Sequence, residues 1–190
     1  MRIIAGEAGG RRITAPAGTN TRPTLDRVRE NLFNMLQGKV EGCRVLDLFA
    51  GSGALSLEAL SRGAKEAVLV DCDRRAVAAE KQNIGALGYG GRAAVVCADW
   101  RQAVSAIQGR GKRFDLVFLD PPYAMQDLRE VFDALVPLLD AEALVVLEHE
   151  AGKKPETGGG FACEKERNWG YCGVSFYRLR SERAEEEEEE

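Results

Sequence analysis

Short apolar runs alternate with helical patterns along most of this chain. The apolar runs, which do not alternate with polar residues, lie at 44–49, 66–71, 93–97, 114–119 and 143–147. Apolar residues at helical spacing follow them at 54–61, 74–86, 101–108 and 128–139. Strands that are apolar on both faces and separated by helices indicate a parallel sheet covered by helices on both sides. The pattern therefore predicts an α/β fold.

The carboxyl-terminal part breaks this alternation. Residues 161–167 and 174–179 have the composition of strands, and the short segment 168–173 leaves no room for a helix between them. The second of these strands must then run antiparallel to the first. We expect a mostly parallel, seven-stranded sheet closed by an antiparallel hairpin strand, an ending that a plain dehydrogenase Rossmann domain does not need.

The amino-terminal part has its own pattern. Residues 2–5 and 11–14 flank a glycine-containing turn and predict a small β-hairpin. A polar loop at 16–23 leads to a helix whose N-cap would be Thr24. Residues 1–31 hold six arginines and three acids, a local excess of positive charge that suits either a polyanionic partner or a solvated face.

The net charge of −4 comes from the carboxyl-terminal end. Residues 182–190 hold seven acids and one base, and removing this charge of −6 leaves +2 on the rest of the chain. Such a run of like charges is typical of a disordered tail. We expect a hairpin and loop at 1–23, a single α/β domain at 24–181 and an acidic tail at 182–190.

Several function classes lack their usual signs in this sequence. Five cysteines are scattered without a Cys-x-x-Cys pair, which indicates reduced thiols. His149 is the single histidine and has no cluster of ligands around it, so we expect no metal site and a strand end at His149 rather than catalysis. No apolar run approaches the roughly 20 residues of a membrane helix, and the first residues lack a signal-peptide core. These features predict a cytoplasmic protein without membrane association.

The most specific chemistry lies at the end of the fourth apolar run, in Asp120-Pro121-Pro122-Tyr123. Two prolines after a strand form a rigid turn without backbone donors. The turn would present a carboxylate, proline carbonyls and an aromatic face, a set that suits a planar ring with an exocyclic amine. Because a Pro-Pro pair alone is equally typical of a strand terminator, the surrounding residues must decide between these interpretations.

A glycine turn follows the first apolar run. Gly51 and Gly53 allow a ligand to approach the backbone closely, and Asp47 and Phe49 stand at the preceding strand end. Ser56 occupies the third glycine position of G-x-G-x-x-G, so the dinucleotide fingerprint is incomplete. We expect Asp47 and the turn to face the cationic or amino-acid end of a ligand.

Two further carboxylates follow neighbouring strands. Asp71 stands where a carboxylate can accept hydrogen bonds from both hydroxyls of a ribose. Asp99, with Trp100 beside it, could serve the amino group and the face of an adenine, and a helix N-cap is the alternative for Asp99. Since open α/β sheets bind ligands at the carboxyl ends of their strands, the sequence predicts a nucleoside site beside the turn at Asp120.

Together these motifs resemble class I S-adenosylmethionine (SAM)-dependent methyltransferases that act on exocyclic amines. The segment 21–34, TRPTLDRVRENLFN, is more specific, together with RIIAG at 2–6 and GRRI at 10–13. These segments are similar to the RsmD-type family of 16S ribosomal RNA guanine-N2 methyltransferases. The resemblance covers about residues 1–180, and the acidic tail has no counterpart in the family pattern.

The resemblance implies a Rossmann-like fold, SAM as cofactor, and a monomer that acts on ribosomal RNA within a small-subunit particle. It implies a catalytic turn that holds the guanine N2 amine and stacks on the base, formed by Asp120, Pro121, Pro122 and Tyr123. The implied cofactor site consists of Asp47, Phe49, Gly51, Gly53, Asp71, Asp99 and Trp100. The implied contacts to RNA phosphates are Arg2, Arg11, Arg12 and Arg22.

Two alternatives stay open at this point. An adenine-N6 DNA methyltransferase uses the same four-residue turn, although this chain has no long insertion that could read a duplex. A non-catalytic RNA-binding module with a methyltransferase fold is the second, and the intact glycine turn and Asp120 turn argue against it. The choice of guanine over adenine rests on the family resemblance alone.

Overall fold

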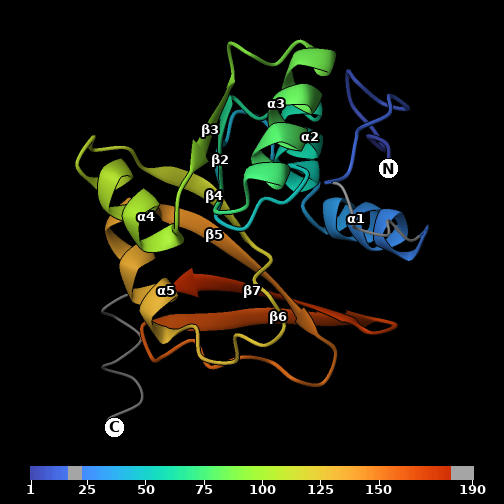
Figure 1. Ribbon diagram of the computed structural model, residues 1–190. Coiled ribbons are helices and arrows are strands. Elements are labelled where there is room, and N and C mark those ends of the chain that lie inside the picture. The colour runs from blue at the N-terminus through green and yellow to red at the C-terminus, as the bar shows by residue number, and fades with distance from the viewer. Residues whose placement is uncertain (17–22, 181–190) are drawn as a thin grey trace, which may run out of the picture.

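A seven-stranded sheet forms the centre of the computed structural model, which describes residues 1–16 and 23–180 (Figure 1). The strand order is β3-β2-β1-β4-β5-β7-β6. Strands β1 to β5 pair in parallel, and β7 pairs antiparallel with both β5 and β6. The predicted sheet and its antiparallel closing hairpin are confirmed. The bounds are β1 Arg44–Asp47, β2 Glu66–Asp71, β3 Ala93–Cys97, β4 Phe114–Leu119, β5 Leu139–Glu150, β6 Phe161–Trp169 and β7 Cys172–Leu179.

Helices cover both faces of the sheet, because the central strands are apolar on both sides. One face carries α1 (Pro23–Met35), α2 (Ala54–Ser61) and α3 (Arg74–Leu87), and the other carries α4 (Trp100–Gln108) and α5 (Arg129–Leu135) (Figure 1). Successive strand residues divide between two buried clusters: Leu69 belongs to the cluster under α1 to α3, and Val70 to the cluster under α4 and α5. The two clusters fix the strands in register and hold their carboxyl ends together at one edge.

The connection between α5 and β5 differs from the sequence prediction. The prediction of a single helix over 128–139 is wrong beyond Leu135, where a 3-10 turn at Val136–Leu138 follows. Pro137 lies in this turn and cannot donate the backbone hydrogen bond that an α-helix needs. The strand then begins at Leu139 instead of residue 143. The first residues of β5 include polar side chains, which break the apolar pattern of a buried strand. One of them, Asp140, pairs with Arg44 at 2.6 Å across the sheet.

The amino-terminal segment pairs with itself less than predicted. Instead of two strands at 2–5 and 11–14, the structure has a single antiparallel bridge between Arg2 and Arg12. The physical reason lies in α2, whose buried Glu58 carboxylate accepts the backbone N–H groups of Ile4 at 2.7 Å and Ala5 at 3.0 Å. These donors point to Glu58, so the hairpin is shorter than predicted and is held by the Arg2–Arg12 bridge and the backbone hydrogen bonds around it.

Ser61 at the end of α2 holds the next part of this segment. Its backbone oxygen accepts from Glu7 N at 2.8 Å, and its hydroxyl accepts from Ala8 N at 3.0 Å. Together with Glu58, these contacts fasten residues 1–14 to the same helix that follows the glycine turn. The amino-terminal segment is therefore part of the wall of the site and packs on the α/β domain; the part of the predicted 1–23 unit at 17–22 lies outside the described residues.

Candidate active site

One cavity of about 230 Å³ opens at the carboxyl ends of β1, β4 and β5. Sheet residues form its floor, and the amino-terminal segment and α1 form its opposite wall. Of the residues predicted for cofactor binding and catalysis, the cavity brings together Asp47, Phe49, Gly51 and Asp120. The remaining lining includes Met1, Pro16, Val28, Arg29, Leu32 and Glu148. The cavity thus lies at the strand edge where the sequence predicts a site, while the wall around it was not foreseen.

The glycine turn between β1 and α2 has the backbone geometry that its residues predict. Gly51 has φ +57° and Gly53 has φ +76°, both in the left-handed region that favours glycine. A Cβ at Gly53 would lie 2.6 Å from the Leu69 side chain, whereas a Cβ at Gly51 would meet open space. Gly53 is therefore required by packing, and Gly51 leaves room for a ligand on the cavity side.

Asp47 lies beneath this turn and is almost fully buried. Its Oδ2 accepts a hydrogen bond from the Ser56 hydroxyl at 2.9 Å, and its Oδ1 has no partner among the described residues. Burial raises the pKa of Asp47 to about 7, partly offset by the bond from Ser56. A buried carboxylate oxygen without a donor is costly, so this edge of the cavity suits a ligand that brings a cation or an N–H group.

Asp71 supports the glycine turn from the neighbouring strand. Its carboxylate accepts the backbone N–H groups of Gly51 at 2.9 Å and Asp73 at 2.8 Å. Each carboxylate oxygen has two lone pairs, so these bonds leave acceptor capacity for ribose hydroxyls. Asp71 does not line the cavity itself. Its predicted role toward a ribose stays a prediction, and the structure adds a second role in shaping the turn.

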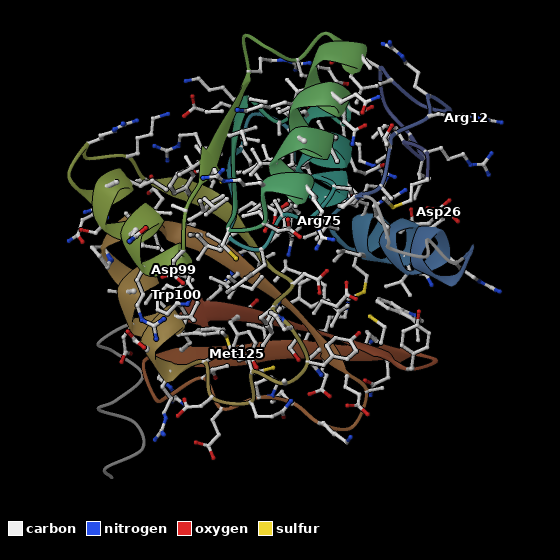
Figure 2. The ribbon with its side chains drawn as sticks, viewed as in Figure 1. Arg12, Asp26, Arg75, Asp99, Trp100 and Met125 are labelled. Carbon is white, nitrogen blue, oxygen red and sulfur yellow. The ribbon has the colours of Figure 1, made fainter. Side chains whose placement is uncertain are left out.

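Asp99 and Trp100 lie at the start of α4, outside the cavity lining (Figure 2). Asp99 is the N-cap of α4 and accepts from Arg101 N at 2.9 Å, which matches the alternative considered for it. Trp100 is only 5% exposed and packs in the cluster under α4 and α5. The Arg101 guanidinium covers its ring at 4.4 Å from the centroid. An open Trp100 face for an adenine is therefore corrected to a core position, because the ring anchors α4 to the sheet.

The Asp120 turn follows β4, and the strand register places a second carboxylate beside it. Leu119 of β4 pairs with Leu147 of β5, so the next residues, Asp120 and Glu148, end up as neighbours. Asp120 lines the cavity and is exposed to solvent there. Desolvation by the neighbouring protein atoms, together with the nearby charges of Glu148 and Asp47, raises the pKa of Asp120 well above the usual range.

Tyr123 follows Asp120 in the same turn but lies outside the lining of the cavity. It is partly exposed, and its pKa is raised by burial and by the Glu148 carboxylate. Pro121 is buried and Pro122 is exposed, so the two prolines hold the turn between the core and the surface. Of the four residues of this turn, only Asp120 lines the cavity, so the predicted roles of Pro121, Pro122 and Tyr123 toward a base stay predictions.

Glu148 lines the cavity and was not predicted from the sequence. It stands in the run Leu147-Glu148-His149-Glu150, which looks like an ordinary polar strand end. The signal that could have found it is register: in neighbouring parallel strands, residues that follow matched apolar runs meet at the same edge. This inference requires knowing that β5 lies beside β4 and where β5 begins. The sequence placed the start of β5 at residue 143 instead of Leu139.

The arginines predicted for RNA separate into different positions. Arg11 donates to the backbone oxygens of Ala86 and Leu87 at the end of α3, so it caps that helix. Arg12 is exposed, and its side chain points away from the body of the molecule (Figure 2). Arg2 is also exposed, and Arg22 lies outside the described residues. Arg12 and Arg2 are thus freer to meet a polyanion than Arg11.

Behind the glycine turn lies a second unforeseen acid, Glu80 of α3. It is fully buried, and neither carboxylate oxygen has a hydrogen-bond partner in the described part of the chain. Burial and the charges of Asp47 and Asp71 raise its pKa from an ordinary 4.5 to about 8. The folded protein therefore holds a proton on Glu80 over a pH range in which the unfolded chain does not.

This raised pKa predicts a pH-dependent stability. The contribution of protonated Glu80 is fully present below about pH 4.5 and is lost as the pH rises through about 8. We expect Glu80→Gln, which cannot ionise, to melt at a higher temperature than wild type at pH 9 and to show a much smaller difference at pH 5. Thermal melts across this range test it, with Glu30→Gln on the exposed face of α1 as control. A difference in melting temperature between Glu80→Gln and wild type that stays the same at all pH values would contradict the prediction.

Comparison with known proteins identifies the family. The family model described as Conserved hypothetical protein 95 matches residues 1–178. The chain belongs to this family. The class I methyltransferase fold is confirmed by the strand order and by the structural neighbours below.

Similar members of this family share most of their length with the chain. YlbH of Bacillus subtilis is 39% identical over 183 residues, covering 95% of this chain and 100% of the relative. Ribosomal RNA small subunit methyltransferase D of Escherichia coli is 36% identical over 181 residues, covering 94% and 89%. The solved structure of Escherichia coli yhhF superimposes with a TM-score of 0.80 at 36% identity, covering 96% and 99%. The predicted resemblance to the RsmD-type family is thereby confirmed.

No helix within residues 1–16 and 23–180 has the length and apolarity needed to cross a bilayer. Within the same ranges, no three or more metal-binding side chains gather into a group.

Proposed function

We propose that this protein is a SAM-dependent methyltransferase that acts on the exocyclic N2 amine of a guanine in small-subunit ribosomal RNA. The observation that carries the proposal is the rigid Asp120 turn, which opens into the same cavity as the glycine turn and Asp47. One cavity can then hold a methyl donor and a planar base edge side by side. The name of the Escherichia coli relative, an rRNA small subunit methyltransferase, supports the RNA substrate.

The residues around the glycine turn fit SAM. Gly51 leaves open space where a side chain would stand, and the unpartnered Oδ1 of Asp47 suits the positive end of the cofactor. Asp71 would hold the ribose from the end of β2 while it keeps Gly51 in place. Asp99 could still reach an adenine amine with lone pairs that its N-cap bond leaves free. When bound, SAM supplies an electrophilic methyl group on a sulfonium.

The Asp120 turn supplies alignment and charge stabilisation. A guanine N2 amine is a weak nucleophile because its lone pair is delocalised into the ring. The Asp120 carboxylate and the Pro121 carbonyl would accept its N–H groups, orient the amine and stabilise positive charge as it develops. Alignment of this kind can contribute several of the roughly 7–11 kcal/mol available from proximity. Tyr123 would stack on the base, which must leave its helical stack to enter the cavity.

The test of this function is methyl transfer with product identification. Tritiated SAM is incubated with small-subunit particles from cells that lack the modification, and in parallel with naked ribosomal RNA. The expected result is N2-methylguanosine in the digested RNA. Label in the N6-methyladenine of duplex DNA, added as a third substrate, would instead support the adenine-N6 DNA methyltransferase alternative, and SAM binding without any transfer would support a non-catalytic module.

The exposed arginines give a separate prediction about RNA. Arg12→Glu should lower RNA affinity and flatten its dependence on salt, because each phosphate contact adds about one unit to the slope of log K against log salt. Arg11→Glu should also destabilise the fold, because Arg11 caps α3. Binding titrations at several salt concentrations, together with thermal melts, separate the two effects. An unchanged salt slope for Arg12→Glu would show that this segment does not contact RNA.

The proposal extends to where and how the enzyme works. We propose a cytoplasmic monomer whose substrate is an assembling small-subunit particle. A chain of 190 residues with a modest group of exposed arginines has little surface with which to select one nucleotide. Protein or folded RNA surfaces of the particle would supply the rest of the specificity. Higher activity on particles than on naked RNA is the result that this view predicts.

A further inference from the structure

Two carboxylates stand side by side at the edge of the sheet where the base would enter. The register of β4 and β5 pairs Leu119 with Leu147, and the following residues, Asp120 and Glu148, both line the cavity. Asp120 belongs to the turn that holds an exocyclic amine. Glu148 has no assigned role, although pairing with Val174 of β7 fixes its backbone.

The groups around Glu148 leave its acceptor capacity for a ligand. The Tyr123 hydroxyl and the Cys172 thiol face the carboxylate as weak donors, and burial raises its pKa. In the described ranges, no lysine or arginine forms a salt bridge with Glu148 or Asp120. Two adjacent carboxylates without paired cations repel each other, here at a cavity edge where Glu148 is partly exposed and Asp120 is exposed. Their arrangement becomes favourable when a ligand brings two adjacent hydrogen-bond donors.

Guanine offers such a pair of donors, and adenine does not. On its Watson–Crick edge, guanine has N1–H directly beside the N2 amine. Adenine has its amine beside N1, which there carries a lone pair and no hydrogen. A carboxylate next to the amine-binding residue would therefore attract guanine and repel adenine, as a site built to bind a donor rejects a base that lacks it.

We propose that Glu148 selects guanine by accepting a hydrogen bond from N1–H while Asp120 accepts from the N2 amine. This inference rests on the proposed function and deepens it, since it gives a residue of this chain for the choice between guanine and adenine. Glu148 acts on the base itself, and Tyr123 links it to the stacking face through their contact. The proposal predicts that replacing the Glu148 carboxylate by an amide and removing the hydrogen from N1 of the base have linked effects on substrate preference.

The experiment replaces one partner on each side of the contact. RNA fragments carry either guanine or 2-aminopurine at the modified nucleotide; 2-aminopurine keeps the 2-amine but has a bare N1. Wild type should prefer guanine by about a hundredfold in kcat/KM. In Glu148→Gln, whose amide can donate to a bare N1, this preference should fall about tenfold or more. The missing O6 of 2-aminopurine affects both enzymes alike, so the change in preference reports on residue 148.

A matched control lies two residues further along β5. Glu150 pairs with Lys153 at 2.8 Å and does not line the cavity. Glu150→Gln should keep the wild-type preference. If Glu148→Gln turns over too slowly to measure, fluorescence titration of the 2-aminopurine RNA against guanine RNA as competitor gives the same comparison from binding alone.

The outcomes distinguish failure of this inference from failure of the proposed function on which it rests. If wild type forms N2-methylguanosine and Glu148→Gln loses activity or affinity equally for both bases, Glu148 is structural and the assignment is overturned. If wild type methylates no guanine in particles or RNA, the proposed function itself fails, whatever Glu148 does. A preference that shifts toward 2-aminopurine in Glu148→Gln alone supports both.

Discussion

Replacement of Asp120 by asparagine should abolish methyl transfer and leave SAM binding close to normal. The side chain keeps its size, but an amide cannot supply the full negative charge that stabilises a developing cation. Loss of one such preorganised group typically lowers kcat by about 10²–10³. Asp120 lies at the base end of the cavity, beside Glu148 and beyond the glycine turn, so the cofactor contacts at Asp47 and Gly51 should persist.

Two measurements make this prediction specific. Tritiated methyl transfer onto small-subunit particles gives the rate, and calorimetry gives the SAM affinity of the same preparation. Asp133→Asn, on the exposed face of α5, is the control for a lost carboxylate and should behave as wild type. Weakened SAM binding with retained transfer would reverse the assignment and place Asp120 in the cofactor site.

The parallel strands and the glycine turn could be predicted from the sequence because their signals are local. Apolar runs such as Phe114–Leu119 must be buried on both faces, and Gly51 and Gly53 must sit where only glycine is relaxed. A motif at the end of one strand then fixes which edge of the sheet carries the site. These inferences require only neighbouring residues and the geometry of parallel sheets.

The features that the sequence did not predict depend on contacts between distant segments. Whether the Trp100 ring is open to a ligand depends on how α4 packs on the sheet. In the structure, Trp100 is only 5% exposed. The hairpin is shorter than predicted because Glu58, more than fifty residues away, takes the backbone donors of Ile4 and Ala5. Glu148 became visible only when the register of β5 against β4 was known.

The amino-terminal segment illustrates how such a distant contact reaches function. Sequence reading assigned it to RNA through its arginines, yet its backbone builds one wall of the cavity, with Met1 and Pro16 in the lining. It reaches that place by packing on α2 at Glu58 and Ser61. Damage to this docking should therefore affect stability and cofactor affinity together, before any effect on RNA contacts.

Replacement of Gly6 by alanine should break that docking. Gly6 has φ +83°, and a Cβ there would lie 1.9 Å from the backbone oxygen of Ser61, which cannot move without unwinding the end of α2. Gly10 in the same segment has nearly the same φ, +82°, but a Cβ there meets nothing within 4 Å. Gly10→Ala thus has the same left-handed strain, about 1–2 kcal/mol, without the clash.

The difference between the two variants isolates the docking of the segment. If Gly6→Ala displaces residues 4–8, the fully buried Glu58 loses two backbone donors, which costs about 3 kcal/mol or more beyond the strain. For a chain of this size that corresponds to a melting temperature about 6–12 °C below that of Gly10→Ala. SAM affinity should fall in Gly6→Ala and hold in Gly10→Ala, since only the former opens the cavity wall. Equal melting temperatures and SAM affinities in the two variants would show that the wall does not depend on this contact.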